Sequence, residues 1–149
     1  NHITLCGCSQ GGLVCSLAAS EKEDEIERLI MYYPALCVPD DARRGCLIGT
    51  QIDPDNVPDS FHGVFVKLGK KYVEDARTLD PYEQICTFKK PVLIIHGIED
   101  KLVKIEYSRK ANERYDDCEL IEVHGDHGFI LKGFKAGKKA TEKYLSDLD

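Results

Sequence analysis

Five residues near the start of the chain, Gly7-Cys8-Ser9-Gln10-Gly11, form a G-x-S-x-G motif between an apolar run and a helical pattern. A strand, this motif and a helix in succession produce a sharp turn that exposes the serine at the end of a sheet strand. We expect the glycines at both ends to let the backbone turn without a side-chain clash. The helix that starts there would offer unpaired N–H groups beside Ser9. The alternative is a simple helix start with Ser9 as its N-cap.

Two later segments place an acid and a histidine in equivalent positions. Residues 91–97 are apolar and β-branched, which predicts a buried parallel strand, and Asp100 follows that strand. A second strand is expected over residues 119–123, and His127 follows it. Sites in open α/β sheets lie outside the carboxyl ends of the strands. This chain order indicates nucleophilic catalysis by Ser9, with His127 as base and Asp100 as its orienting acid.

Other residues compete for the acid and base roles. His124 falls at the end of a predicted strand, whereas His127 falls in the loop that follows it. His96 lies inside the predicted buried strand and is expected to be a hydrogen-bonded core residue. Two more carboxylates compete with Asp100 for the acid role. They are Glu99, next to it in sequence, and Asp126, which suits a turn beside the base.

The chain resembles the C-terminal part of an α/β-hydrolase fold serine esterase, and most of all the feruloyl and cinnamoyl esterase group. Besides the serine motif, the matching stretches are residues 40–45 (DDARRG), 53–59 (DPDNVPD), 76–83 (ARTLDPYE), 90–97 (KPVLIIHG) and 126–129 (DHGF). The match runs along almost the whole chain, and the middle stretches indicate the subgroup. The resemblance implies an α/β fold, with a mostly parallel sheet flanked by helices and a cap insertion between two strands.

The resemblance also implies an activity and the residues that carry it. A small-molecule carboxylic ester, expected to be a hydroxycinnamate, would be hydrolysed through an acyl-enzyme without a cofactor or metal. Ser9, Asp100 and His127 would be catalytic, and the Gln10 backbone N–H would belong to the oxyanion hole. A generic short-chain acyl esterase or a lipase is the alternative within the class. A non-catalytic fragment that needs a missing N-terminal half is the alternative outside it.

The start of the chain departs from the resemblance. The family's sheet has several strands before the serine motif, and this chain begins at the strand that leads into the motif. The loop that supplies a second oxyanion N–H would lie in the preceding part. We therefore expect a piece of a longer protein. The exposed edge of its first strand would bind the missing N-terminal half or self-associate.

Three regions are expected along the chain. Residues 1–36 hold the first strand, its helix and the next strand, which is expected over residues 31–36. Residues 89–149 hold the part of the core with the acid and the histidine. Residues 37–88 break the alternation of strands and helices, and an insertion of this length is typical of a functional segment. We expect it to form a cap over Ser9.

The cap is where the resemblance places substrate specificity. It implies that Asp41 and Tyr72 line the acyl pocket, where polar groups hydrogen-bond the ring hydroxyls of a hydroxycinnamoyl group. A site built around a substrate hydroxyl rejects analogues that lack it. The alternative is structural, with Asp41 as a helix N-cap in a surface ion pair and Tyr72 as packing.

Composition narrows the partners further. The net charge of −6 argues against nucleic-acid binding, since no basic face is available to neutralise phosphates. No apolar run approaches the length of a membrane span, so a membrane partner is not expected. The spacing of the seven cysteines fits neither a zinc site nor a redox pair. We expect reduced, mostly buried thiols and a cytoplasmic location.

Overall fold

The computed structural model describes residues 3–63, 66–129 and 133–146. It divides into two compact units, of which the first combines Asn1–Leu36 with Pro81–Asp149 and the second is Cys37–Asp80. The first unit contains the serine motif and both later strands. The second unit is an insertion in sequence between two strands of the first.

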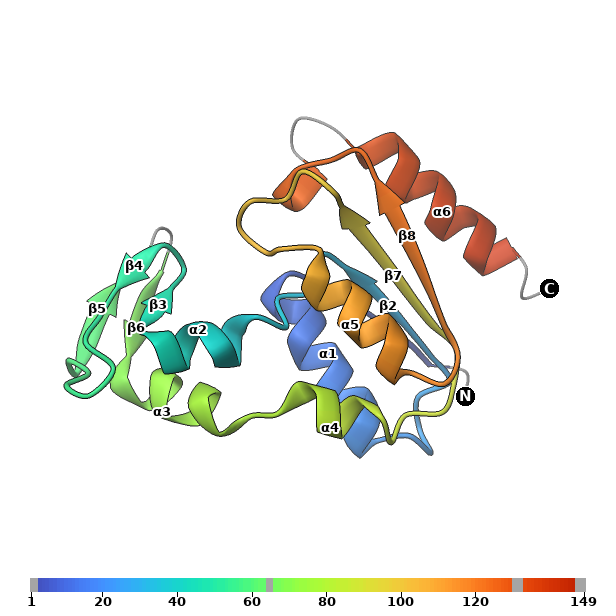
Figure 1. Ribbon diagram of the computed structural model, residues 1–149. Helices are drawn as coiled ribbons and strands as arrows, with labels where there is room; N and C mark the ends of the chain where they lie inside the picture. The colour runs from blue at the N-terminus through green and yellow to red at the C-terminus, as the bar shows by residue number, and fades with distance from the viewer. Residues whose placement is uncertain (1–2, 64–65, 130–132, 147–149) are drawn as a thin grey trace. The chain divides into compact units, whose positions relative to one another are not determined.

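The first unit is built on a parallel sheet with the strand order β1-β2-β7-β8. Its strands are β1 (Thr4–Cys8), β2 (Arg28–Tyr32), β7 (Val92–Gly97) and β8 (Cys118–Val123). Because the strands are parallel, their carboxyl ends meet at one edge of the sheet (Figure 1). This edge brings together loops that are distant in sequence.

Helices cover both faces of this sheet (Figure 1). Those of the first unit are α1 (Gln10–Glu21), α4 (Pro81–Ile85), α5 (Glu106–Arg114) and α6 (Phe134–Ser146). α1, α4 and α5 lie on one face and contact each other in sequence order, while α6 packs on the other face against β7 and β8. The predicted mostly parallel sheet with flanking helices is confirmed.

β7 is the centre of the core, and all of its residues are buried. Successive side chains of a strand point to opposite faces of the sheet. Leu93 and Ile95 therefore share one face with a cluster that includes Phe129 and side chains of α6. The alternate residue His96 points to the other face, where it meets Ser108 of α5. A strand buried on both faces explains its continuous apolar sequence.

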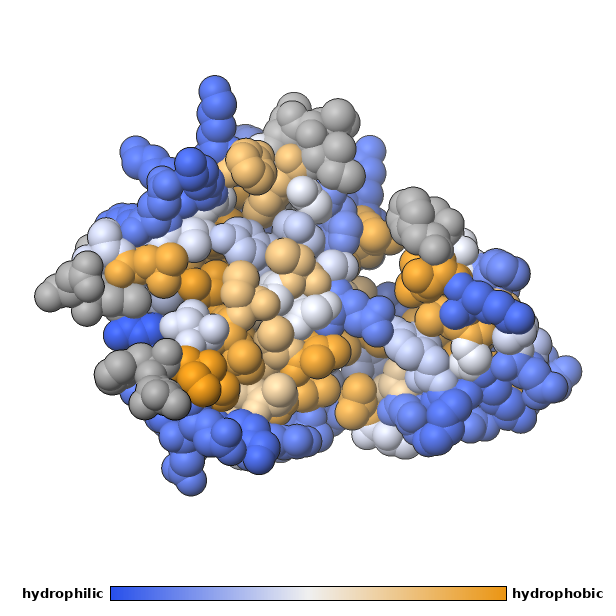
Figure 2. Space-filling model, turned by 180° about the vertical axis from the view of Figure 1, so that it is seen from behind, coloured by the Kyte–Doolittle hydropathy of each residue, from blue (hydrophilic) through white to orange (hydrophobic). Residues whose placement is uncertain are grey.

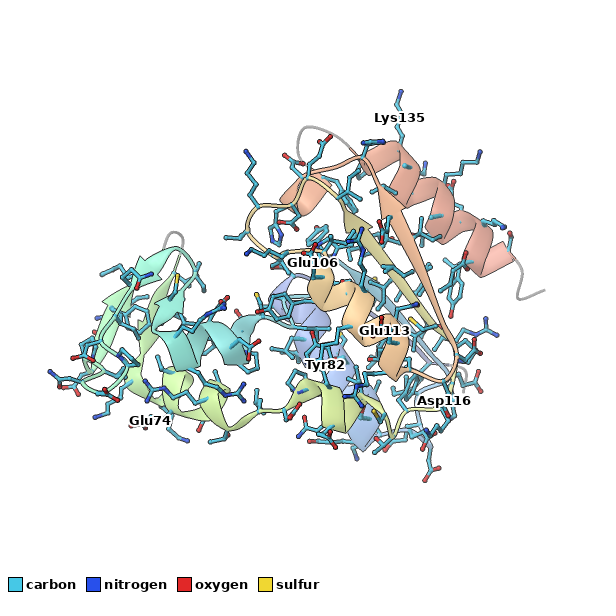
Figure 3. The ribbon with its side chains drawn as sticks, viewed as in Figure 1. Glu74, Tyr82, Glu106, Glu113, Asp116 and Lys135 are labelled. Carbon is cyan, nitrogen blue, oxygen red and sulfur yellow. The ribbon has the colours of Figure 1, made fainter. Side chains whose placement is uncertain are left out.

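Tyr82 ties α4 to α5 (Figure 3). Its hydroxyl donates to the carbonyl oxygen of Tyr107 at 3.1 Å. The ammonium of Lys110 lies 3.9 Å from the centre of its ring, a cation–π contact. α4 therefore belongs structurally to the sheet unit, although it follows the inserted segment in sequence.

In its described residues, the second unit has two helices and two short antiparallel ribbons. Its elements are α2 (Val38–Arg44), β3 (Cys46–Leu47), β4 (Thr50–Gln51), β5 (Ser60–His62), β6 (Lys67–Gly69) and α3 (Lys70–Thr78). Two arginines hold it together. Arg43 donates to the carbonyl oxygens of Arg77 and Leu79 at 3.1 and 2.5 Å, and Arg77 donates to that of Ala42 at 3.3 Å.

Three sequence expectations need correction. The inserted unit ends at Asp80 rather than at residue 88, because α4 packs with the sheet unit. The strand expected over residues 31–36 is β2 at Arg28–Tyr32, since Pro34 cannot donate to a ladder. The seven free cysteines are not mostly buried, because only Cys37 is buried while Cys6 and Cys8 are exposed.

β1 lies at one edge of the sheet. Among the described residues it pairs with β2 alone, so the polar backbone groups along its other edge have no partner strand there. Figure 2 shows apolar side chains gathered on the reverse face of the first unit. Within the described ranges, no helix is both long and apolar enough to cross a bilayer.

Candidate active site

Ser9 occupies the turn between β1 and α1. Its φ of 51° and ψ of −122° form a strained conformation that few residues other than glycine adopt. Backbone hydrogen bonds hold this turn, because the Ser9 N–H donates to Tyr32 O at 2.9 Å and its carbonyl accepts from the N–H of Ala35 at 2.8 Å. Its side chain makes no helix-capping hydrogen bond. Ser9 is therefore not a conventional N-cap, and its hydroxyl points toward His127.

The three predicted side chains form a continuous hydrogen-bonded chain. His127 Nε2 lies 3.0 Å from Ser9 Oγ, and its Nδ1 lies 2.8 Å from Asp100 Oδ2. Because an ionised carboxylate can only accept hydrogen bonds, His127 Nδ1 carries the proton and donates it to Asp100. His127 Nε2 is then unprotonated and can accept a hydrogen bond from the Ser9 hydroxyl. All three residues belong to the first unit. Their geometry is that of a serine activated by an oriented imidazole.

The Asp100 carboxylate is fully buried and held on both oxygens. Oδ1 accepts from the backbone N–H groups of Leu102 and Val103 at 2.9 and 2.8 Å, while Oδ2 faces His127 and His96. Burial alone would raise the pKa of Asp100. Hydrogen bonds from His127, His96 and Val103 outweigh that effect and lower the pKa below its ordinary value. The acid is therefore ionised across the neutral range.

The loops that carry the acid and the base are in direct contact. A Cβ atom at Gly97 would lie 2.2 Å from the carbonyl oxygen of Gly125, closer than real side chains approach. The N–H of Glu99 also donates to Gly125 O at 3.0 Å. Only glycine fits at residue 97, and this contact sets the separation of Asp100 from His127.

Tyr33 supports the base from the end of β2. Its ring centre lies 4.8 Å from that of His127 at an interplanar angle of 59°, and 5.0 Å from that of Phe129. Its φ of 38° is a second strained conformation beside the site. Tyr33 was not predicted from the sequence, because nothing in the pattern around it distinguishes it from a residue that ends a strand.

The other residues considered for the acid and base roles do not take part in the hydrogen bonds that link Ser9, His127 and Asp100. His124 is 83 % exposed, and its Nδ1 lies 3.6 Å from Glu99 Oε1, so these two residues face each other. Asp126 lies in the turn before the base, where its carbonyl accepts from Phe129 N–H. His96 is buried and hydrogen-bonded, as expected for a core histidine. Its partner Ser108 was not predicted, although helical spacing to buried Ala111 is a signal for it.

Gln10 is the first residue of α1, directly after Ser9. The first N–H groups of a helix have no acceptor within that helix. The Gln10 N–H therefore lies at the start of α1, next to the serine. An oxyanion formed there would accept a hydrogen bond from this N–H, and the positive end of the helix dipole would stabilise its charge.

Asp41 and Tyr72 both lie in the second unit, on the neighbouring helices α2 and α3. Asp41 pairs with Arg44 at 2.5 Å and hydrogen-bonds the Cys37 thiol. The Tyr72 hydroxyl is buried without a hydrogen-bond partner among the described residues. Burial raises the pKa of Tyr72, and the nearby Cys37 and Asp41 raise it further. Asp41 is not the N-cap of its helix, which is Cys37.

No cluster of three or more His, Cys, Asp or Glu side chains suited to a metal ion is present in the described part of the chain. The described part of the chain also has a hollow of about 350 Å³, which neither Ser9 nor His127 lines. Its lining includes Cys8, which precedes Ser9, Gly128, which follows His127, and side chains of α6.

A parallel sheet with a strained serine after one strand, and an acid and a histidine after two others, defines an α/β-hydrolase fold. Solved structures agree. Est1E from Butyrivibrio proteoclasticus is 33% identical with a TM-score of 0.90, over 99% of this chain and 62% of that one. The same protein with ferulic acid bound matches with the same identity and TM-score, over 60% of its length.

Paleococcus ferrophilus monoacylglycerol lipase shares the fold at 20% identity and a TM-score of 0.67, over 98% of this chain and 69% of that one. No model of a protein family matches the chain, and no curated protein does. The solved structures therefore show that the chain has the α/β-hydrolase fold. It spans slightly less than two thirds of the Est1E structures that it matches.

Proposed function

We propose that this chain carries the catalytic centre of a serine carboxylic-ester hydrolase that works through an acyl-enzyme. One observation carries the proposal, namely the pair of hydrogen bonds that link the three side chains. Ser9 Oγ lies 3.0 Å from His127 Nε2, and His127 Nδ1 lies 2.8 Å from Asp100 Oδ2. The strained backbone conformation of Ser9 supports it, because such strain persists where the surrounding structure requires it.

The reaction follows from the protonation states in the site. His127 Nε2 takes the proton of Ser9 as Oγ attacks the ester carbonyl carbon, and the Gln10 N–H donates to the oxyanion. When the tetrahedral intermediate collapses, the C–O bond to the alcohol breaks and His127 returns the proton to the leaving oxygen. A water then gives a proton to the same imidazole and attacks the acyl carbonyl carbon. The bond between that carbon and Ser9 Oγ breaks, His127 returns the proton to Oγ, and the carboxylic acid leaves. Asp100 stabilises the imidazolium in both steps.

A second oxyanion donor is part of the proposal. Such sites use two backbone N–H groups, the second from a loop after another strand of the sheet. We propose that the open edge of β1 accepts a further strand, from an N-terminal half or from a second copy of the chain. Size-exclusion chromatography tests this edge, because a clean monomer at high concentration would count against it.

The substrate that we propose is a hydroxycinnamate ester. Likeness to Est1E, whose structure has been solved with ferulic acid bound, supports this class of acyl group. The unpartnered hydroxyl of Tyr72 supports a polar contact with the substrate ring, since a buried hydroxyl without a partner costs about 1–3 kcal/mol. In this proposal Tyr72 and Asp41 bind a ring hydroxyl of the acyl group.

A fluorophosphonate serine probe tests the catalytic centre directly. We expect one adduct by intact mass on the wild-type chain and none on Ser9→Ala, with equal thermal unfolding of the two. An adduct that persists in Ser9→Ala would remove this serine from the mechanism. Turnover of methyl ferulate against a short-chain 4-nitrophenyl ester then separates a hydroxycinnamate esterase from a generic acyl esterase.

A further inference from the structure

A second histidine lies behind the acid. His96 is fully buried on β7, and its Nε2 lies 3.2 Å from Asp100 Oδ2, the same oxygen that contacts His127. Its Nδ1 lies 2.6 Å from the hydroxyl of Ser108, which is also fully buried. Ser108 belongs to α5, the helix that begins at Glu106 (Figure 3). The acid is thus contacted by one histidine on the serine side and one on the core side.

The surroundings of His96 fix its tautomer. Nε2 faces two acceptors, the Asp100 carboxylate at 3.2 Å and the Val103 carbonyl oxygen at 3.0 Å, so Nε2 carries a proton. Nδ1 faces a hydroxyl, which can donate to it. The neutral ring then satisfies every polar atom, with Ser108 donating to Nδ1 and Nε2–H donating toward Asp100 and Val103. A charged ring is not needed.

We propose that Ser108 and His96 form a positioning pair that fixes the Asp100 carboxylate for the base. The inference rests on the proposed function, since Asp100 is the acid of that mechanism. Neither residue touches Ser9 or the expected position of the substrate, so both act through Asp100.

The geometry shows why a second donor is useful. The backbone N–H groups of Leu102 and Val103 hold Oδ1 and leave Oδ2 to be directed by side chains. Of the two side chains on Oδ2, His127 is 21 % exposed whereas His96 is completely buried. The rigid partner is therefore His96, and it keeps Oδ2 in place while His127 gains and loses its proton. Ser108 keeps the His96 ring from rotating about its bond to the strand.

Nitrogen-15 NMR of the histidine rings tests the pair without requiring activity. In the wild-type chain we expect His96 with its proton on Nε2 and His127, when neutral, with its proton on Nδ1. A proton on Nδ1 of His96 would overturn the proposal. In His96→Phe, which removes the donor but keeps a ring, we expect the His127 Nδ1–H resonance to move. In His96→Gln, whose amide can donate at the Nε2 position, we expect it to stay close to wild type.

The rate of fluorophosphonate labelling of Ser9 supplies the second readout. We expect His96→Phe to be slower by about tenfold to 10²-fold, with His96→Gln restoring most of the rate. Ser108→Ala should be slowed, whereas Ser16→Ala, which removes another fully buried serine hydroxyl on α1, should not. If His96→Phe unfolds at a lower temperature while its labelling rate and His127 resonance match wild type, His96 is merely structural and the proposal fails. An unlabelled wild type would refute the proposed function instead, and the NMR readouts would still decide the pair.

Discussion

A Cβ atom at Gly7 would lie 2.3 Å from the carbonyl oxygen of Gly11, whereas a Cβ at Gly11 would meet nothing within 4 Å. The two outer glycines of the serine motif are thus not equivalent. Gly7 is buried under the first turn of α1, and its close approach is what permits the sharp turn at Ser9. The expectation that both glycines prevent a clash holds for Gly7 and not for Gly11. Gly12 takes that second role, because its Cβ would lie 2.8 Å from Pro34 Cβ.

Gly7→Ala and Gly11→Ala form a matched pair that tests this asymmetry. We expect Gly7→Ala to lower the free energy of unfolding by about 1–3 kcal/mol or more and to slow Ser9 labelling, since backbone must move to admit the methyl group. Gly11→Ala should leave stability unchanged or raise it by up to about 1 kcal/mol, because alanine favours the helix. Urea unfolding of both variants gives the comparison. Equal losses of stability would contradict the assignment.

The order of chemical groups along the chain predicted that Ser9, Asp100 and His127 would meet, and the structure brings these three side chains within hydrogen-bond distance. Ser9, Asp100 and His127 are each marked by the apolar strand before them, and parallel strands bring their ends to one edge. No sequence pattern predicts the contacts between residues across that edge. The close approach of Gly97 and Gly125 depends on loop conformation, and the stacking of Tyr33 on His127 depends on a strained backbone angle.

The end of the inserted segment was predicted wrongly for a related reason. α4 is short and follows the inserted segment, so sequence alone assigned it to that segment. It joins the sheet unit through the ring and hydroxyl of Tyr82, and such tertiary contacts leave no local pattern. Burial of the cysteines was expected because free cysteine behaves as a small hydrophobe, whereas Cys6 and Cys8 are exposed on a strand at the edge of the sheet.

Asp100 links stability to pH. Its pKa is lowered in the folded chain, chiefly by hydrogen bonds from His127 and His96 that outweigh the opposing effect of burial. A lowered folded pKa contributes stability above the unfolded value of about 3.9, and this stability is lost as pH falls toward the folded value. In Asp100→Asn the side chain at residue 100 has no ionisable group, and its amide NH₂ can face the histidines, which also donate hydrogen bonds at this position. We expect it to cost at least about 1.5–3 kcal/mol at pH 7.

The same pair of proteins supplies the check. The difference in free energy of unfolding between wild type and Asp100→Asn should shrink as pH is lowered from about 5 to 3, as far as both remain folded. Urea titrations at each pH measure it, and Asp116→Asn, at an exposed ion pair with Lys89, is the control. A difference that stays constant over this range would mean that Asp100 does not carry the linkage.

Tyr33 should influence the base through its ring rather than its hydroxyl. The ring contacts both His127 and Phe129, and such aromatic pairs contribute about 0.5–1.5 kcal/mol beyond buried area. We expect Tyr33→Phe to label Ser9 at nearly the wild-type rate and Tyr33→Ala to label it more slowly. The strained φ is shared by both variants, so it does not confound the comparison. A larger effect of Tyr33→Phe than of Tyr33→Ala would show that the hydroxyl matters instead.

Tyr72→Phe tests the proposed substrate, because it removes one hydroxyl and keeps the ring. The Tyr72 hydroxyl is buried without a partner among the described residues, so its loss should leave the stability of the second unit unchanged or slightly improved. In an active form of the protein, we expect kcat/KM for methyl ferulate to fall by about 10-fold or more, since a hydrogen bond to a substrate hydroxyl is lost. Tyr72→Phe should hydrolyse methyl cinnamate, which has no ring hydroxyl, as fast as the wild type does.

Asp41→Asn should show the same selectivity, whereas Asp40→Asn, at the neighbouring exposed ion pair with Arg43, should not. Equal losses on both esters would assign Tyr72 to packing and leave the acyl specificity to other residues.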